Sequence, residues 1–201
     1  MRLENKNAII TGATGGIGFA TVSKYLDEGA NVMMVGRSED KLVEVYNQLG
    51  KPNNAAFCVA ESTDEIAIRD SVNKTSDTFG SVDIVIANAG TEGVVQPLVD
   101  YSVQEFNHTL TVNVTGVWLY FKYAIPHMEN QGYGSIVAVA SGAGVVGFPG
   151  LCPYSASKHA VCGMVKTACL EYGEKGIRFN ALAPGPIDNR MMESLGTQSQ
   201  P

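Results

Sequence analysis

The chain has 201 residues, of which 45% are hydrophobic and 17% charged, a composition typical of a globular domain rather than of a disordered chain. A net charge of −6 and a pI near 5.0 argue against a general nucleic-acid binder, which needs clustered lysine and arginine. The sequence contains no run of about 18 apolar residues, the length that a membrane helix requires. Residues 1–10 lack the apolar core of a signal peptide. We therefore expect a cytoplasmic protein with no membrane or nucleic-acid partner.

Short apolar runs rich in β-branched residues alternate along the chain with longer segments of helical period. The runs predict strands at residues 7–11, 31–36, 55–60, 83–88, 135–141 and 177–183. The segments between them predict helices at residues 16–28, 39–49, 64–79, 101–130 and 154–173. The final stretch, ESLGTQSQP, is polar and without period, which predicts a loop.

Strands with so little polar alternation fit a parallel sheet that helices cover on both faces. Alternating strands and helices with right-handed crossovers predict a doubly wound α/β fold, the three-layer Rossmann architecture, with strand order 3-2-1-4-5-6. No linker or repeat divides the chain, so we expect residues 1–201 to form a single domain.

Cysteine and histidine spacing does not indicate a metal site. The cysteines form no CxxC pair and the histidines are scattered along the chain. We expect no metal, and we interpret the cysteines as buried free thiols. These residues are Cys58, Cys152, Cys162, Cys169, His108, His127 and His159.

The segment TGATGGIGFA follows the first strand and opens the first helix, with glycines at positions 12, 15, 16 and 18. The pyrophosphate of a dinucleotide needs a sharp turn, close approach of the backbone and free amides at a helix N-terminus, and glycine allows all three. Such a turn alone also fits an ordinary strand-to-helix loop. Its place directly after the first strand favours nucleotide binding.

Tyr154 and Lys158 lie one helical turn apart, so both side chains project from one face of the predicted helix 154–173. A free phenol has a pKa near 10, and we expect the neighbouring ammonium to lower the pKa of Tyr154 and make it a usable acid and base. Ser141 ends the fifth strand, where open α/β sheets collect ligand-binding groups. The spacing YxxxK alone is common, and its alternative interpretation is an ordinary surface helix.

Together these motifs resemble the short-chain dehydrogenase/reductase family. Its TGxxxGIG motif is matched at residues 11–18, its NAG element at 88–90, its NVxGxW pattern at 113–118 and its PG element at 184–185. The resemblance implies a catalytic set of Ser141, Tyr154, Lys158 and Asn113. It implies cofactor contacts by Gly12, Thr14, Gly15, Gly16, Ile17, Gly18, Arg37, Glu61, Asn88, Ala89, Gly90, Tyr154, Lys158, Pro184, Gly185 and Ile187.

The resemblance implies NAD(P)-dependent hydride transfer between nicotinamide C4 and a carbonyl or secondary alcohol carbon. In the family the serine polarises the substrate oxygen, the tyrosine transfers the proton, the lysine also binds the nicotinamide ribose, and the asparagine holds a water beside a bent helix. The substrate type resembles that of 3-oxoacyl carrier-protein reductases or of broad alcohol and ketone reductases. The loops at residues 92–98 and 148–152 are expected to line a partly apolar substrate pocket.

Cofactor choice depends on the end of the second strand. Members that prefer NAD usually have an acid where Gly36 stands, whereas Arg37 can pair with a 2′-phosphate, so we predict NADP(H) over NAD(H). Two positions depart from the family pattern. Glu61 and Ser62 replace the usual aspartate and small apolar residue, and Asn189 replaces a threonine.

Family members usually continue for about fifty further residues, with a last helix and a seventh strand, so the resemblance implies that this sequence lacks that part. The alternative to an enzyme is therefore a nucleotide-binding module without turnover. A homodimer or homotetramer is also expected, because relatives pair the two long helices and these carry more apolar residues than one sheet face needs. The residues counted for this are Trp118, Leu119, Phe121, Val161, Met164 and Val165.

Overall fold

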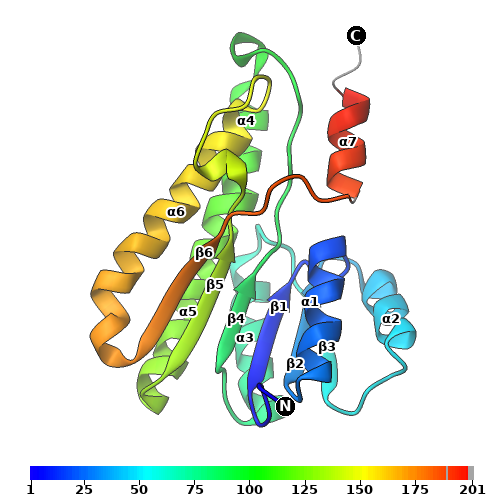
Figure 1. Ribbon diagram of the computed structural model, residues 1–201, viewed down its shortest axis with the longest axis vertical. Helices are drawn as coiled ribbons and strands as arrows, with labels where there is room; N and C mark the ends of the chain where they lie inside the picture. Colours follow the sequence, from blue (N-terminus) through cyan, green and yellow to red (C-terminus); the bar gives the residue numbers. More distant parts are fainter. Residues whose placement is uncertain (189, 199–201) are drawn as a thin grey trace.

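The computed structural model describes residues 1–188 and 190–198, and one parallel sheet runs through its centre (Figure 1). The strand order β3-β2-β1-β4-β5-β6 confirms the predicted doubly wound fold. Each strand lies within two residues of its predicted range. The strands are β1 (Asn7–Thr11), β2 (Asn31–Gly36), β3 (Ala55–Val59), β4 (Ile84–Ala87), β5 (Gly134–Val139) and β6 (Ile177–Leu182).

The helices differ from the prediction at residues 101–130. The single helix predicted there is two helices joined by a π-helical turn at Thr111–Thr115. The helices are α1 (Gly16–Asp27), α2 (Glu39–Gln48), α3 (Glu65–Phe79), α4 (Val103–Leu110), α5 (Gly116–Gln131), α6 (Cys152–Tyr172) and α7 (Arg190–Gln198), with 3₁₀ turns at Leu98–Asp100, Gly142–Gly144 and Gly173–Lys175.

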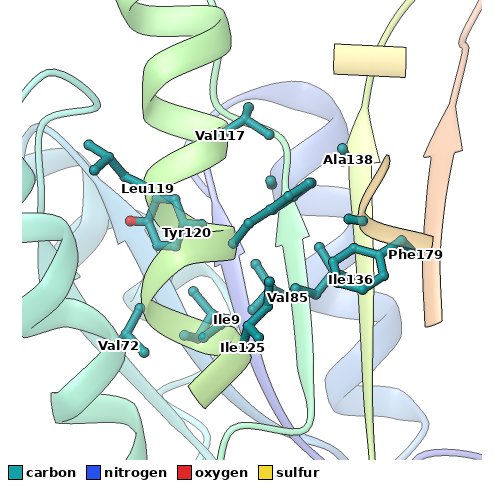
Figure 2. Close-up of a cluster of buried hydrophobic side chains, with 14 of the residues drawn as sticks. Ile9, Val72, Val85, Val117, Leu119, Tyr120, Ile125, Ile136, Ala138 and Phe179 are labelled. Carbon is teal, nitrogen blue, oxygen red and sulfur yellow. The ribbon is translucent and has the colours of Figure 1, made fainter. Parts of the chain in front are cut away.

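The two faces of the sheet carry different helices, because successive side chains of a strand point to opposite faces. Helices α1 and α2 pack on one face, and α3, α5 and α6 pack on the other (Figure 1). Figure 2 shows the cluster on the second face, where Ile9, Val85 and Ile136 of neighbouring strands meet Val72 of α3 and Tyr120 of α5. Full burial of one such aliphatic side chain contributes roughly 1.5–3 kcal/mol, so these clusters fix the strands whose ends carry the site.

The apolar surplus predicted on the long helices is smaller than the sequence indicated. Leu119, Phe121, Val161 and Val165 are buried in the core of this chain itself. The remaining large exposed side chain of that set is Trp118, which is 46% exposed.

The cysteines are free thiols but are less buried than predicted. Cys169 is exposed, and Cys58, Cys152 and Cys162 are half-buried. Within residues 1–188 and 190–198, no helix has the length and apolar character needed to cross a membrane.

Candidate active site

A cavity of about 940 Å³ lies beyond the carboxyl ends of β1, β2, β4 and β5, where open parallel sheets bind their ligands. The predicted site residues come together here, except Gly18 and Asn113, which lie outside the cavity wall. Both exceptions support residues that do line it. The predicted residues in the wall are Gly12, Thr14, Gly15, Gly16, Ile17, Arg37, Glu61, Asn88, Ala89, Gly90, Ser141, Tyr154, Lys158, Pro184, Gly185 and Ile187.

The turn after β1 is tight enough to require glycine at two positions. Gly12 has a φ of +62°, and a Cβ there would lie 2.9 Å from Asn88 Nδ2 and 3.0 Å from the Ala89 Cα. A Cβ on Gly18 would overlap the Gly12 carbonyl oxygen, so the first turn of α1 can pack onto the loop only without a side chain. Gly15, the N-cap of α1, supplies no side chain to the helix amides. A pyrophosphate fits such an N-terminus, because the amides there lack partners within the helix.

Thr11 and Asn88 join this turn to the end of β4. The Thr11 hydroxyl accepts hydrogen bonds from the amides of Asn88 at 2.9 Å and Ala89 at 2.8 Å. The Asn88 side chain donates to the Thr11 carbonyl at 2.9 Å, so Asn88 ties the two strands together as predicted. The backbone on both sides of the cofactor region is therefore fixed by the protein alone.

Asn113 lies in the π-helical turn between α4 and α5 and is fully buried. Its Oδ1 accepts from the Thr91 amide at 2.8 Å, and its Nδ2 donates to the Thr91 carbonyl at 2.9 Å and to Ser157 Oγ at 3.0 Å. The chain thus forms a π-helical turn around this asparagine, where a bend was predicted. The side chain itself fastens the loop after β4 to α6.

Ser141 and Tyr154 both line the cavity. The Ser141 Oγ accepts from the Ala143 amide at 3.1 Å. Tyr154 is only 8% exposed, and its hydroxyl also faces the sulfur of Met191 in α7 at 3.9 Å. A substrate oxygen placed between the two hydroxyls would receive a hydrogen bond from each.

The predicted lowering of the Tyr154 pKa by Lys158 is wrong for this structure. Burial is the largest influence and raises the pKa of Tyr154, the Ser141 hydroxyl lowers it, and the charge of Glu92 raises it. The ammonium of Lys158 lies 5.7 Å from the centre of the Tyr154 ring and donates to the Val139 carbonyl at 2.8 Å. Burial lowers the pKa of Lys158 to about 8.

The cavity reaches the start of α2, where Arg37, Ser38 and Lys41 line it and Ser38 is the N-cap of the helix. The first turn of α2 also carries Glu39 and Asp40, which do not line the cavity. A Cβ on Gly36 would lie 3.3 Å from Leu42 Cδ2, so even a small side chain would crowd this point. The carboxylate of Glu61 accepts a hydrogen bond from the Ser62 amide at 2.9 Å.

A family model described as short chain dehydrogenase matches residues 6–200 of the sequence. The chain belongs to the short-chain dehydrogenase family. It is therefore an oxidoreductase of a family that binds a nicotinamide cofactor.

Three relatives illustrate the likeness of this short-chain dehydrogenase to known proteins. A 3-oxoacyl-[acyl-carrier-protein] reductase of Thermotoga maritima is 38% identical over 197 residues, which cover 97% of this chain and 79% of that protein. The crystal structure of levodione reductase matches with a TM-score of 0.94 and 32% identity, over 98% of this chain and 78% of that one. The crystal structure of NAD⁺-bound xylitol dehydrogenase matches with a TM-score of 0.88 and 33% identity, over 92% and 72% respectively.

The segment that follows β6 in this short-chain dehydrogenase also lines the cavity. The Gly142 amide donates to the Pro184 carbonyl at 2.8 Å, which holds the PG element beside Ser141. Ile187 lines the cavity with Pro184 and Gly185. Asn189, noted in place of a threonine, lies outside the described residues.

The substrate end of this short-chain dehydrogenase contains residues that sequence reasoning did not assign. Glu92 and Phe148 come from the two loops predicted to line the pocket, but the carboxylate of Glu92 was not singled out. Its signal in the sequence is an acid just after the NAG element, at the carboxyl end of a strand. His108 and three residues of the unpredicted helix α7, Met191, Ser194 and Gln198, also line the cavity.

Proposed function

We propose that this protein is a single domain that reduces carbonyl compounds to secondary alcohols with a nicotinamide cofactor, in the manner of a broad ketone reductase or a 3-oxoacyl carrier-protein reductase. One observation carries the proposal. Ser141, Tyr154 and Lys158 line the same cavity as the glycine turn. The names of two relatives, a 3-oxoacyl-[acyl-carrier-protein] reductase and a levodione reductase, support reduction of a carbonyl group.

Tyr154 is the proton donor of the proposed reaction. Because burial raises its pKa, the phenol stays protonated at neutral pH, which is the form that can protonate a developing alkoxide. Ser141 donates to the same oxygen and stabilises its charge. The cofactor supplies the hydride when it is bound.

Lys158 and Asn113 support this pair. The Lys158 ammonium lies on the cavity wall near Gly90. A Cβ on Gly90 would lie 3.5 Å from Lys158 Nζ, so the glycine leaves the ammonium open toward the nicotinamide ribose. Asn113 holds the backbone of Thr91 next to that glycine. We assign Lys158 to ribose binding and Asn113 to positioning of this loop.

NADP(H) is the proposed cofactor in preference to NAD(H). Arg37 and Lys41 supply two cations beside the Ser38 N-cap, a combination that suits a 2′-phosphate, and Gly36 supplies no carboxylate to repel it. Arg37→Leu is expected to weaken NADPH binding about 10- to 100-fold, because a charge-assisted hydrogen bond is lost. NADH affinity, measured on the same variant by fluorescence titration, is the internal control. Equal losses for both nucleotides would contradict the assignment.

The test of the reaction is Tyr154→Phe, which removes the proposed proton donor and little else. We expect kcat with NADPH on a panel of ketones to fall by about 10²- to 10⁴-fold, the usual contribution of general acid catalysis, while the NADPH dissociation constant changes little. Tyr46→Phe, in which the hydroxyl is removed outside the cavity, is the matched control. Turnover that survives Tyr154→Phe would refute the mechanism. Tight NADPH binding by the wild-type protein without turnover of any carbonyl would favour the nucleotide-binding module instead.

A homodimer or homotetramer is proposed as well, although fewer apolar residues are exposed on the long helices than the sequence indicated. Trp118 on α5 and Leu170 on α6 are exposed by 46% and 87%, and large exposed apolar side chains on neighbouring helices favour association. A monomer by sedimentation would contradict this. The cytoplasmic location stays a prediction.

A further inference from the structure

Met191 of α7 places a sulfur atom in front of the Tyr154 hydroxyl. The phenol donates to Met191 Sδ at 3.9 Å, and both side chains line the cavity. A phenol has a single proton to donate, so it can bind the sulfur or a substrate oxygen but not both at once. Met191 therefore competes with a carbonyl oxygen for the proton that the proposed reaction transfers.

Contacts on both sides of Met191 hold its helix over the cavity. Helix α7 lies beyond the carboxyl ends of the strands (Figure 1). At its C-terminal end, Gln198 Oε1 accepts from the Val95 amide, in the loop that follows β4, at 3.0 Å. Ahead of the helix, the Pro184 carbonyl accepts from the Gly142 amide at 2.8 Å. A chemical change at Met191 therefore takes place at the cavity and stays there.

Met191 differs from the other methionines whose side chains the structure describes. Met1 is exposed but does not line the cavity, and Met164 is half-buried against the core on α6. The remaining three are fully buried, namely Met33, Met34 and Met128. Met191 is half-buried and lines the cavity, so a small oxidant that enters the cavity can reach its sulfur.

Oxidation of a thioether changes how strongly it binds a phenol. Hydrogen peroxide transfers one oxygen atom to the sulfur: an S–O bond forms, the O–O bond of the peroxide breaks and water leaves. The sulfur loses two electrons and the peroxide gains them. A thioether sulfur is only a weak acceptor, which a carbonyl oxygen can displace. A sulfoxide is polar, and its oxygen, added on the side that faces Tyr154, binds the phenol in the way a carbonyl oxygen would.

We propose that Met191 is an oxidation site through which hydrogen peroxide inhibits turnover, because the sulfoxide oxygen accepts the hydrogen bond of Tyr154 and excludes the carbonyl group of the substrate. This inference rests on the proposed function and assigns a form of regulation to the same site. The sulfoxide competes with the substrate and leaves the turn after β1 unchanged, so NADPH still binds. Reduction of the sulfoxide to the thioether restores turnover.

The experiment treats the wild-type protein, Met191→Leu and Met164→Leu with increasing amounts of hydrogen peroxide, which catalase then removes. Each sample is measured for kcat/KM of ketone reduction by NADPH, for NADPH affinity by fluorescence titration, and for sulfoxide at each methionine by peptide mass spectrometry. Met164→Leu is the matched control, because it removes a half-buried methionine outside the cavity.

Inhibition should follow the state of Met191 alone. In the wild-type protein and in Met164→Leu, we expect kcat/KM to fall in proportion to the sulfoxide at Met191, by at least about 10-fold at full conversion, the value of one hydrogen bond. NADPH affinity should change little. Met191→Leu has no thioether at this position and should keep its own turnover after the same treatment.

Two further measurements separate Met191 from the cysteines and from a loss of folding. Dithiothreitol alone reverses disulfides and sulfenic acids, whereas methionine sulfoxide needs its reductases, one for each epimer. We expect turnover to return only when both reductases are added with dithiothreitol. Met191→Gln carries an amide oxygen that accepts without any peroxide, so its kcat/KM should be at least about 10-fold below that of Met191→Leu.

Several results would overturn the inference. They are equal inactivation of Met191→Leu and the wild-type protein, recovery with dithiothreitol alone, and unchanged kcat/KM at full conversion of Met191. A thioether at Met191 that survives a dose converting Met164 has the same consequence, as does turnover by Met191→Gln that equals turnover by Met191→Leu. Absence of turnover in the untreated wild-type protein is a distinct result, because it refutes the proposed function on which the inference rests.

Discussion

The two ends of the cavity are built in different ways. At the proposed cofactor end, the turn after β1 forms part of the wall and depends on the missing side chains of Gly12 and Gly18. At the substrate end, the wall is made of side chains from separate loops and from α7, among them Glu92 and Phe148. At the first end, close-packed backbone restricts how near a ligand can come, whereas at the second end the side chains determine the chemistry of the wall.

This difference predicts how each end responds to substitution. At the cofactor end, a side chain added where none fits should block binding of every ligand. At the substrate end, a changed side chain should alter chemistry or choice of substrate and leave nucleotide binding in place. Substitutions at the two ends of the cavity test this contrast.

Gly18→Ala should have the largest effect. The added Cβ overlaps the Gly12 carbonyl oxygen, which belongs to rigid backbone, so α1 or the turn must shift. We expect NADPH affinity to fall more than about 100-fold, with a loss of roughly 1–3 kcal/mol in stability, as for overpacking of a core. Fluorescence titration and urea denaturation measure the two quantities. Wild-type affinity in a folded Gly18→Ala protein would show that the turn is less constrained than its geometry indicates.

Lys158→Met should affect turnover strongly and stability in a pH-dependent way. The ammonium is buried and its pKa falls to about 8, against 10.5 in the unfolded chain. Below pH 8 Lys158 is protonated in both the folded and the unfolded protein, so the cost of burying its charge does not change with pH. Between pH 8 and 10.5 the unfolded protein binds more protons than the folded protein, so the stability of the wild-type protein rises with pH. Across that range the free energy of unfolding of the wild-type protein increases by at most about 3 kcal/mol relative to that of Lys158→Met.

Urea denaturation of the wild-type protein and Lys158→Met between pH 7.5 and 10 checks this sign. As the pH increases, the free energy of unfolding of the wild-type protein should rise relative to that of Lys158→Met. Parallel curves would mean that Lys158 is not desolvated in the free protein. In the same variant kcat should fall about 10- to 100-fold, because the proposed charge-assisted hydrogen bond from Lys158 to the nicotinamide ribose is lost.

The fold and the cofactor end could be predicted from the sequence because their determinants are local. Apolar runs define each strand, and the glycines of the turn after β1 stand next to one another in the chain. That Ser141 and Tyr154 lie at the same cavity was also predicted, because the two residues flank one strand-to-helix connection. The direction of the Tyr154 pKa shift was not predicted correctly. The pKa of Tyr154 depends on burial by distant elements and on Glu92, which no local pattern reveals.

The same distinction explains the missed helix α7 and the role of Asn113. Helix α7 is short and polar, and it lies over the cavity through contacts such as Gln198 Oε1 with the Val95 amide at 3.0 Å, which join residues far apart in the sequence. Asn113 was assigned from resemblance, but its three hydrogen bonds to Thr91 and Ser157 show that it positions a loop. Residues that act through distant contacts require the structure.

Gly15→Ala should have the smallest effect and is the sharpest companion to Gly18→Ala. Both variants add one methyl group to the same glycine-rich segment. At Gly15 the backbone is extended, with a φ of −91°, and a Cβ would meet only the Gly12 carbonyl oxygen at an ordinary 3.5 Å. We expect NADPH affinity to change less than about fivefold, because the amide of this residue stays in place and only a methyl group is added to the cavity wall. A loss as large as that of Gly18→Ala would mean that the turn tolerates no added side chain at either position, and that its glycines serve close contact with the ligand rather than packing of the protein on itself.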